Sequence, residues 1–220
     1  MEFSSVPRLF PVTNLDEVVG FSVPQAFLWT AQKGMQSLGT LPGGYYSQAL
    51  GINDAGQVVG FSNAADGNWH GFRWTKSQGM RVLRYLPGGK SASANGINQH
   101  GQIAGGSSLA ACGFCSHAVV WNQNGSVQDL GVLPGQGWST AFAINDFGQV
   151  VGWSGFTAFI WSEEDGMQDL NRLIPGDSGW QLTTANAIND KGQITGQGTI
   201  NGEAHGFLLT PTSGPLWGCN

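Results

Sequence analysis

The sequence predicts an all-β fold, a five-bladed β-propeller built from about five four-stranded repeats. The segment GINDAGQVVGFS at 51–62 returns as GINQHGQIAGGS, AINDFGQVVGWS and AINDKGQITGQG, and VTNLDEVVGFS near the start is a divergent copy. Intervals of 39, 45, 47 and 44 residues, typical of repeat architectures, separate the aligned asparagines Asn14, Asn53, Asn98, Asn145 and Asn189. Glycine makes up 35 of 220 residues and 10% are charged, as in turn-rich β-proteins.

The repeats account for nearly the whole chain, so we expect one domain, 1–220. The repeat units span about 6–46, 47–90, 91–138, 139–182 and 183–218. Each unit contains four short apolar segments, which in the second unit are Ser47–Asn53, Gln57–Ser62, His70–Thr75 and Met80–Leu86. An N-x-x-G tetrapeptide joins the first two segments. Asn bonds readily to its own backbone and Gly allows a positive φ, so this tetrapeptide predicts a hairpin turn.

The first segment of each unit carries small residues on one face. Four residues before the marker asparagines stand Ala49, Ala94, Ala141 and Ala185, and two residues before them stand Gly51, Gly96, Ala143 and Ala187. Side chains in a strand alternate between faces, so this face must lie where backbones crowd. The inner strands around a propeller axis are such a place. The periodicity alone also allows a stacked solenoid, and the small residues favour the ring.

The third segment supplies large rings at alternating positions, among them Phe27, Trp29, Phe72, Trp74, Trp121, Phe159, Trp161 and Phe207. We expect these rings to fill the space between blades. The fourth segment ends in LPGG or a close variant, which carries the chain to the next unit. The first unit lacks a convincing first strand because VPRLFPVT holds two prolines, and the last unit's fourth strand shrinks to SGPLWGC. Ring closure is expected between these irregular ends.

The units resemble the extracellular repeats of the HAF family, named for a His-Ala-Phe tripeptide in a unit that reads [AG]-I-N-D-x-G-Q-V-V-G, then H-[AG]-F-x-W. The resemblance covers about residues 12–210. The tripeptide stands here as Gln25-Ala26-Phe27, His70-Gly71-Phe72, His117-Ala118-Val119, Thr157-Ala158-Phe159 and His205-Gly206-Phe207. The resemblance implies propeller-like repeats in a secreted or surface-exposed bacterial protein. It implies no activity and no catalytic residues.

Charge and hydropathy exclude several partners. The net charge is −5 and the nine Lys and Arg residues are scattered singly, so there is no basic surface for nucleic acid. No apolar run approaches the roughly 20 residues of a membrane-spanning helix, and the apolar stretch at the start is too short for a signal peptide, although one removed earlier is possible. We expect no membrane insertion, no cofactor and a monomer.

The three cysteines suggest no metal site. Cys112 and Cys115 form a C-x-x-C, with His117 two residues further on, and Cys219 stands next to the last residue. A structural zinc site would want a second pair of ligands. A local disulfide or two free thiols is the simpler reading.

The positions that break the repeat predict the function. The loops between second and third strands vary from GFT to GSSLAACGFCS, and they share one face of the ring with the connections between units. Variable loops on a rigid scaffold are the usual layout of a binding surface, and also the default state of loops. The aromatic residues expected there, as a surface for carbohydrate or another polar ligand, are Tyr45, Tyr46, Trp69, Trp138 and Trp180.

A glycan-active enzyme, a hydrolase or a lyase, is the alternative. The inner segments contain no Asp or Glu, so the two carboxylates of a glycosidase would have to come from loops. The weak catalytic candidates are His70, His117, His205, Asp66 and Glu203. The three histidines occupy equivalent positions, which a structural role predicts equally well. A third possibility is an adhesion or spacer domain that binds no glycan.

Overall fold

The computed structural model describes residues 8–13, 15–110 and 115–212. Its strands form five separate antiparallel sheets, one per repeat unit, in which sequential strands are neighbours. The first sheet contains β1 (Arg8–Val12), β2 (Val18–Ser22), β3 (Gln25–Thr30) and β4 (Gly34–Gly39). The second contains β5 (Ser47–Ile52), β6 (Val58–Asn63), β7 (Trp69–Thr75) and β8 (Gly79–Val82). The third contains β9 (Ala92–Ile97), β10 (Ile103–Ser108), β11 (Ser116–Trp121) and β12 (Val127–Gly131).

The last two sheets differ from one another in strand number. The fourth sheet contains β13 (Ser139–Ile144), β14 (Val150–Ser154), β15 (Thr157–Ser162) and β16 (Gly166–Asp169), and a short 3-10 helix, η1 (Leu170–Arg172), follows it. The fifth sheet has three strands, β17 (Trp180–Ile188), β18 (Ile194–Ile200) and β19 (Glu203–Leu209). The fourth strand expected at SGPLWGC lies outside the described residues.

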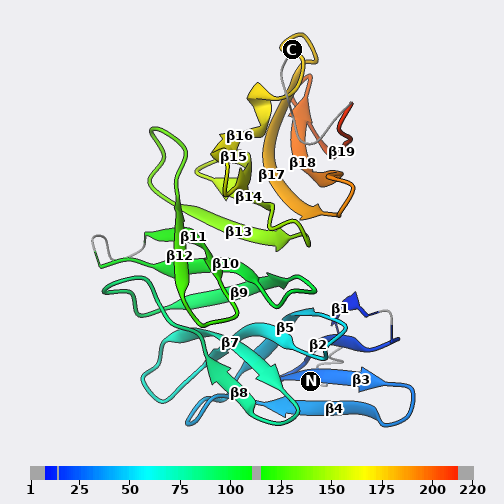
Figure 1. The fold of residues 1–220 in the computed structure, drawn as a ribbon, viewed down its shortest axis with the longest axis vertical. Coiled ribbons are helices and arrows are strands. Elements are labelled where there is room, and N and C mark those ends of the chain that lie inside the picture. The colour runs from blue at the N-terminus through cyan, green and yellow to red at the C-terminus, as the bar shows by residue number, and fades with distance from the viewer. Residues whose placement is uncertain (1–7, 14, 111–114, 213–220) are drawn as a thin grey trace, which may run out of the picture.

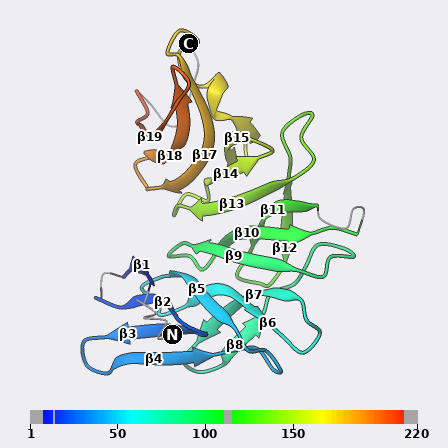
Figure 2. The same ribbon diagram turned by 180° about the vertical axis from the view of Figure 1, so that it is seen from behind.

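The sheets follow one another in chain order, and each packs on the next (Figures 1 and 2). The first strands of successive sheets are in contact, from β1 through β5, β9 and β13 to β17. The small residues Ala49, Ala94, Ala141 and Ala185 are all fully buried between sheets, as their pattern predicted. Within the described residues no extensive contact joins the first sheet to the fifth, and the two lie at opposite ends of Figure 1. The expected ring closure is therefore not seen there.

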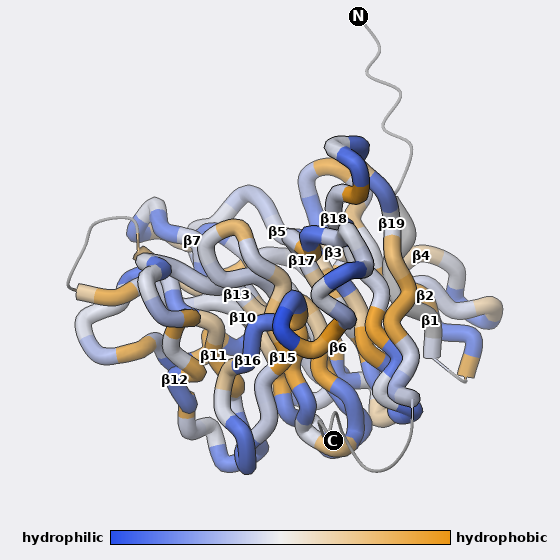
Figure 3. Tube along the Cα trace, turned by 90° about the horizontal axis from the view of Figure 1, so that it is seen from above, coloured by the Kyte–Doolittle hydropathy of each residue, from blue (hydrophilic) through white to orange (hydrophobic). Residues whose placement is uncertain are grey.

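Four hydrophobic clusters fill the four spaces between neighbouring sheets. Viewed from above, hydrophobic stretches of strands such as β6 and β15 lie inside (Figure 3). The third-strand rings Phe27, Phe72, Trp121 and Phe159 are at most 2% exposed, which confirms their role as core. Trp29 differs, at 37% exposed, because no sheet of the described chain precedes the first one.

The N-x-x-G turns form as expected. Gly56, Gly101, Gly148 and Gly192 have φ between 69° and 77°, and each donates its N–H to the carbonyl of the marker Asn. The Asn side chain then holds the residue after the turn: Asn53 Oδ1 accepts from Gln57 N at 3.1 Å, and Asn53 Nδ2 donates to Gln57 Oε1 at 2.9 Å. The same pairs recur in the other three complete turns.

Two expectations about strands were wrong. The first unit does have a first strand, β1, which pairs with β2 across an irregularity between Leu9 and Val12. Pro11 lies within that irregularity, where a ladder hydrogen bond is dispensable. The fourth strand of the second unit ends at Val82 rather than at Leu86, and Leu86 N donates to Ser107 Oγ of the third sheet at 3.0 Å.

Candidate ligand-binding site

The connection between the first and second sheets is fixed to the second sheet by Asn63, the last residue of β6. The Asn63 side chain is buried, and its Oδ1 accepts from the backbone N–H groups of Tyr45 at 2.9 Å and Tyr46 at 2.8 Å. Ser108 does the same one sheet later, where its Oγ accepts from Lys90 N and Ser91 N. The buried Asn63 and the half-buried Ser108 therefore fix the backbone from which Tyr46 and Lys90 extend.

Four aromatic rings gather at this end of the first two sheets. Tyr46 stacks on Phe61 with ring centroids 6.4 Å apart, and Trp69 meets both rings edge-on, at 5.7 Å and 5.5 Å. Phe21 of the first sheet joins the group beside Tyr46, at 6.1 Å. Such offset and edge-to-face arrangements are the favourable ones. We call Phe21, Tyr46, Phe61 and Trp69 the aromatic cluster; Trp69 remains 43% exposed in it.

The loop before Trp69 is held by a hydrogen-bonded chain of three side chains. His70 Nε2 bonds to Asp66 Oδ1 at 2.8 Å, and His70 Nδ1 bonds to the hydroxyl of Tyr85. Asp66 also accepts from Asn68 N at 3.1 Å and Asn68 Nδ2 at 3.0 Å. His70 is 5% exposed, and neither it nor Asp66 or Tyr85 lines a described cavity. These three hydrogen-bonded side chains therefore position the loop before Trp69 and do not face a substrate site.

Titration of Asp66 tests this arrangement. Hydrogen bonds from the Asn68 side chain, the His70 side chain and the Asn68 backbone hold the pKa of Asp66 well below its usual range. A lowered pKa contributes stability above the unfolded pKa of about 3.9, and that contribution is lost as pH falls through the folded value. We expect the carboxyl ¹³C resonance of Asp66 to keep its ionised position from pH 7 down to about pH 3.

Asp177 provides the comparison, since it is an exposed carboxylate in the connection between the fourth and fifth sheets. Alanine at position 66 should increase amide exchange at Asn68, and alanine at 177 should leave it unchanged. An Asp66 resonance that titrated with a midpoint near 4 would contradict the hydrogen-bonded loop.

A cavity of about 730 Å³ lies beside the aromatic cluster, at the ends of the second, third and fourth sheets. Its volume falls in the range of about 300–1,000 Å³ that ligand sites occupy. Trp69 and Asn68 line one side. Hydroxyl groups line much of the rest: those of Ser91, Ser93, Ser108, Ser116 and Thr140. Lys90 is the one charged residue among the described residues that line it.

The cavity exists because Gly106 breaks a pattern. The equivalent strand position carries Phe21, Phe61 and Trp153 in the first, second and fourth sheets, and only backbone hydrogen in the third. A Cβ atom at Gly106 would meet Thr140 at 3.5 Å, an ordinary contact, so the backbone does not require glycine there. Without a large ring, the third sheet leaves room above it.

The other aromatic residues predicted to bind ligand lie elsewhere. Tyr45 is 74% exposed and has no ring contact within the described residues. Trp138 pairs with Phe156 at 6.3 Å, and Trp180 lies against His205 at 6.3 Å and Phe207 at 6.4 Å. Among the five, the structure brings together only Tyr46 and Trp69. Phe61, which was not predicted, joins them. It stands two residues after Val59 and therefore lies on the same face of β6, a signal that the sequence does contain.

The remaining catalytic candidates do not converge. His117 of the third sheet pairs with Asp129 through Nδ1 at 2.9 Å, whereas His205 and Glu203 are exposed on β19, the last strand of the fifth sheet within the described residues. Cys115 is in a disulfide, and Cys112 and Cys219 lie outside the described residues. No group of three metal-binding side chains occurs in the described part of the chain.

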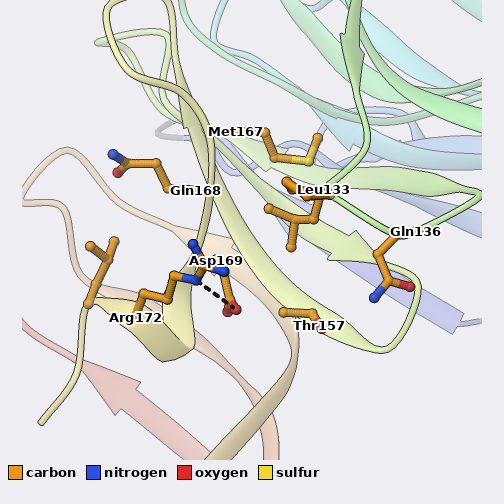
Figure 4. Close-up of a pocket in the computed structure, with 9 residues that line it drawn as sticks. Leu133, Gln136, Thr157, Met167, Gln168, Asp169 and Arg172 are labelled. Carbon is orange, nitrogen blue, oxygen red and sulfur yellow. Dashed lines mark ion pairs between the residues drawn. The ribbon is translucent and has the colours of Figure 1, made fainter. Parts of the chain in front are cut away.

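A smaller hollow of about 290 Å³ lies on the fourth sheet (Figure 4). Leu133 and Met167 stand side by side in it, and Gln136 and Thr157 lie across from Arg172. Asp169 is the one carboxylate among the described residues that line it. Its side chain accepts from Asn171 N at 2.8 Å and lies 4.0 Å from Arg172. A glycosidase needs two carboxyl groups, one as acid and one as base, so a single carboxylate that is already hydrogen-bonded does not provide that pair.

Comparisons with known proteins place the fold. The crystal structure of TolB from Acinetobacter baumannii matches 94% of this chain with a TM-score of 0.55 and 12% sequence identity. The chain covers 55% of that TolB structure, about half its length. At this identity the match establishes the fold alone: an all-β propeller fold of five blades with three or four antiparallel strands each. No family model and no curated protein matches the sequence. None of the helical segments described could span a bilayer.

Proposed function

We propose that this protein binds carbohydrate in the cavity beside Trp69. The observation that carries the proposal is the combination of an exposed indole, braced by Tyr46 and Phe61, with a cavity lined by hydroxyl and amide groups. A sugar ring offers an apolar C–H face and a rim of hydroxyl groups. The aromatic wall suits that face, and the Ser, Thr and Asn side chains can donate to and accept from the rim.

The geometry favours binding over cleavage. Carbohydrate hydrolysis by most enzymes needs two carboxyl groups about 5–10 Å apart, and no Asp or Glu is among the described residues that line the cavity. His70, the residue after Trp69, is buried and engaged on both ring nitrogens, and His117, the residue after Ser116, is paired with Asp129. The site therefore supports retention of a glycan without chemistry.

The setting of this function is also part of the proposal. We propose a monomer located outside the cell or on its surface, as the HAF-like repeats imply. The disulfide at Cys115 supports this location, because disulfides persist in oxidising compartments. The low fraction of charged residues, 10%, suits an uncharged polar ligand.

An array of neutral and acidic cell-wall glycans tests the proposal, with soluble products from the same wells analysed by mass spectrometry. We expect at least one glycan to be retained without shortened or unsaturated products. Products would replace the binding module with an enzyme. Retention of no glycan would contradict the proposal and favour a spacer or a protein partner.

A further inference from the structure

The marker asparagines link neighbouring sheets as well as closing their own turns. Asn53 Nδ2 donates to Asn98 O at 3.0 Å, Asn98 Nδ2 to Asn145 O at 3.0 Å, and Asn145 Nδ2 to Asn189 O at 3.1 Å. Each of these bonds crosses from one sheet to the next. The marker Asn of the second, third and fourth units thus donates a side-chain hydrogen bond to the marker Asn of the next unit.

A second hydrogen bond accompanies each of these Asn bonds between neighbouring sheets. The N–H of the residue after the Asn donates to the side chain at the same position of the next unit: Asp54 N to Gln99 Oε1 at 3.0 Å, Gln99 N to Asp146 Oδ1 at 2.8 Å, and Asp146 N to Asp190 Oδ1 at 2.9 Å. The I-N-[DQ] sequence is therefore an interface motif. In each pair of neighbouring units, the earlier unit supplies the N–H donors and the later unit supplies the oxygen acceptors.

The fifth sheet leaves the donor end of this series open. Asn189 retains its local bonds to Gln193, but within the described residues its second amide hydrogen and the N–H of Asp190 have no partner. Asn189 is exposed, whereas Asn53, Asn98 and Asn145 are 1–4% exposed.

The rest of the same face is uncovered as well. Leu208 is 62% exposed, although the equivalent residues Leu28, Val120 and Ile160 are buried against the following sheet. Thr195 is exposed where Val19, Val59, Ala104 and Val151 are fully buried. Gly206 keeps the small size of Ala26, Gly71, Ala118 and Ala158, which lets the next first strand approach. The fifth sheet thus retains the features of a sheet that is covered by a successor.

We propose that this face of the fifth sheet is a docking surface for a further repeat unit of the same I-N-[DQ]-x-G-Q type. The incoming unit places the carbonyl of its Asn against Asn189 Nδ2 and its Asp or Gln side chain against Asp190 N. Three interfaces in the molecule already use this pairing, so the proposed contact continues an established one.

A second copy of this chain fits less well. The sheet it would offer is its first, where Leu15 occupies the position of Gln99, Asp146 and Asp190 and offers no side-chain acceptor. The partner is therefore a unit with a polar acceptor at that position.

A six-unit chain tests the proposal. Thr210, directly after β19, is the position equivalent to Ser162 at the end of β15. A copy of residues 163–210 can therefore replace 211–220 directly after Thr210 and supply a fourth strand, a connection and three further strands. In that chain we expect amide exchange at Asp190 to slow by at least about tenfold relative to the unextended chain. The urea midpoint should shift by the same amount for Asn189→Ala as for Asn145→Ala.

The unextended protein is the control. There Asn189→Ala should shift the urea midpoint by clearly less than Asn145→Ala, because the two side chains share their local bonds to Gln193 or Gln149 and differ in the bond between sheets. Equal shifts in the unextended protein would overturn the proposal. So would an added unit that stays unfolded by circular dichroism, or self-association of the unextended protein that Asn189→Ala abolishes. Glycan retention is measured separately and bears only on the proposed binding site.

Discussion

Gly152→Ala should unfold the protein or lower its free energy of unfolding by at least about 4 kcal/mol, measured by urea denaturation. A Cβ atom at this position would lie 2.0 Å from the carbonyl oxygen of Thr140 and 2.9 Å from Cε1 of Phe159. Both neighbours are held by the core, since Phe159 is fully buried and Thr140 is part of β13. The strain cannot be relieved by a side-chain rotation.

The control for this substitution is Gly137→Ala, in the connection before β13. A Cβ atom there would have no neighbour within 4 Å, and Gly137 does not have a positive φ. We expect a change within about 0.5 kcal/mol, as for most surface substitutions. If Gly152→Ala left the midpoint urea concentration of unfolding unchanged, β13 and β14 would have to lie further apart than described.

The same crowding explains the equivalent glycine in the second, third and fifth units. Gly60, Gly105 and Gly196 would each place a Cβ atom 1.9–2.0 Å from a carbonyl oxygen of the neighbouring first strand. The register between first and second strands shifts beside these glycines, as at Ala49/Gly51 and Ala141/Ala143. Such a bulge puts an extra residue in one strand. Periodicity revealed the glycine as part of the repeat, but the bulge that requires it depends on pairing between strands and was not predicted.

Local chemistry predicted local structure well. The N-x-x-G turns, the alternating strands and the buried third-strand rings all follow from residues close in sequence. The second role of Asn98, its hydrogen bond to Asn145 O, joins residues 47 positions apart, and turn chemistry alone was sufficient to explain the Asn. Long-range pairing of this kind is what a single sequence does not reveal.

The candidate site shows the same division. Trp69 and Tyr46 were predicted as ligand-binding residues, and the structure brings them together. Trp138 and Trp180 were predicted on the same grounds, but each contacts other rings, because the sheets fan out and separate one connection from the next. The cavity itself results from an absence, the missing ring at Gly106, which becomes visible only when equivalent strand positions are compared in space.

Trp69→Ala should weaken glycan binding by about tenfold or more, which corresponds to about 1.4 kcal/mol. The substitution removes the exposed indole from the wall of the cavity, and an aromatic contact of this kind contributes roughly that free energy. Isothermal titration with the glycan identified on the array measures the effect. Trp138→Ala is the matched control, since Trp138 is similarly exposed, at 41% against 43%, but does not line the cavity.

Gly106→Phe tests the cavity without removing any group that would contact the ligand. The new Phe ring would stand on the third sheet at the position equivalent to Phe61 on the second, and its Cβ atom has space beside Thr140. We therefore expect a folded protein with a thermal midpoint close to that of the wild type and no measurable glycan binding. If this variant and Trp69→Ala both bound the glycan with wild-type affinity, the ligand would have to bind elsewhere, because together they fill the cavity and remove its aromatic wall.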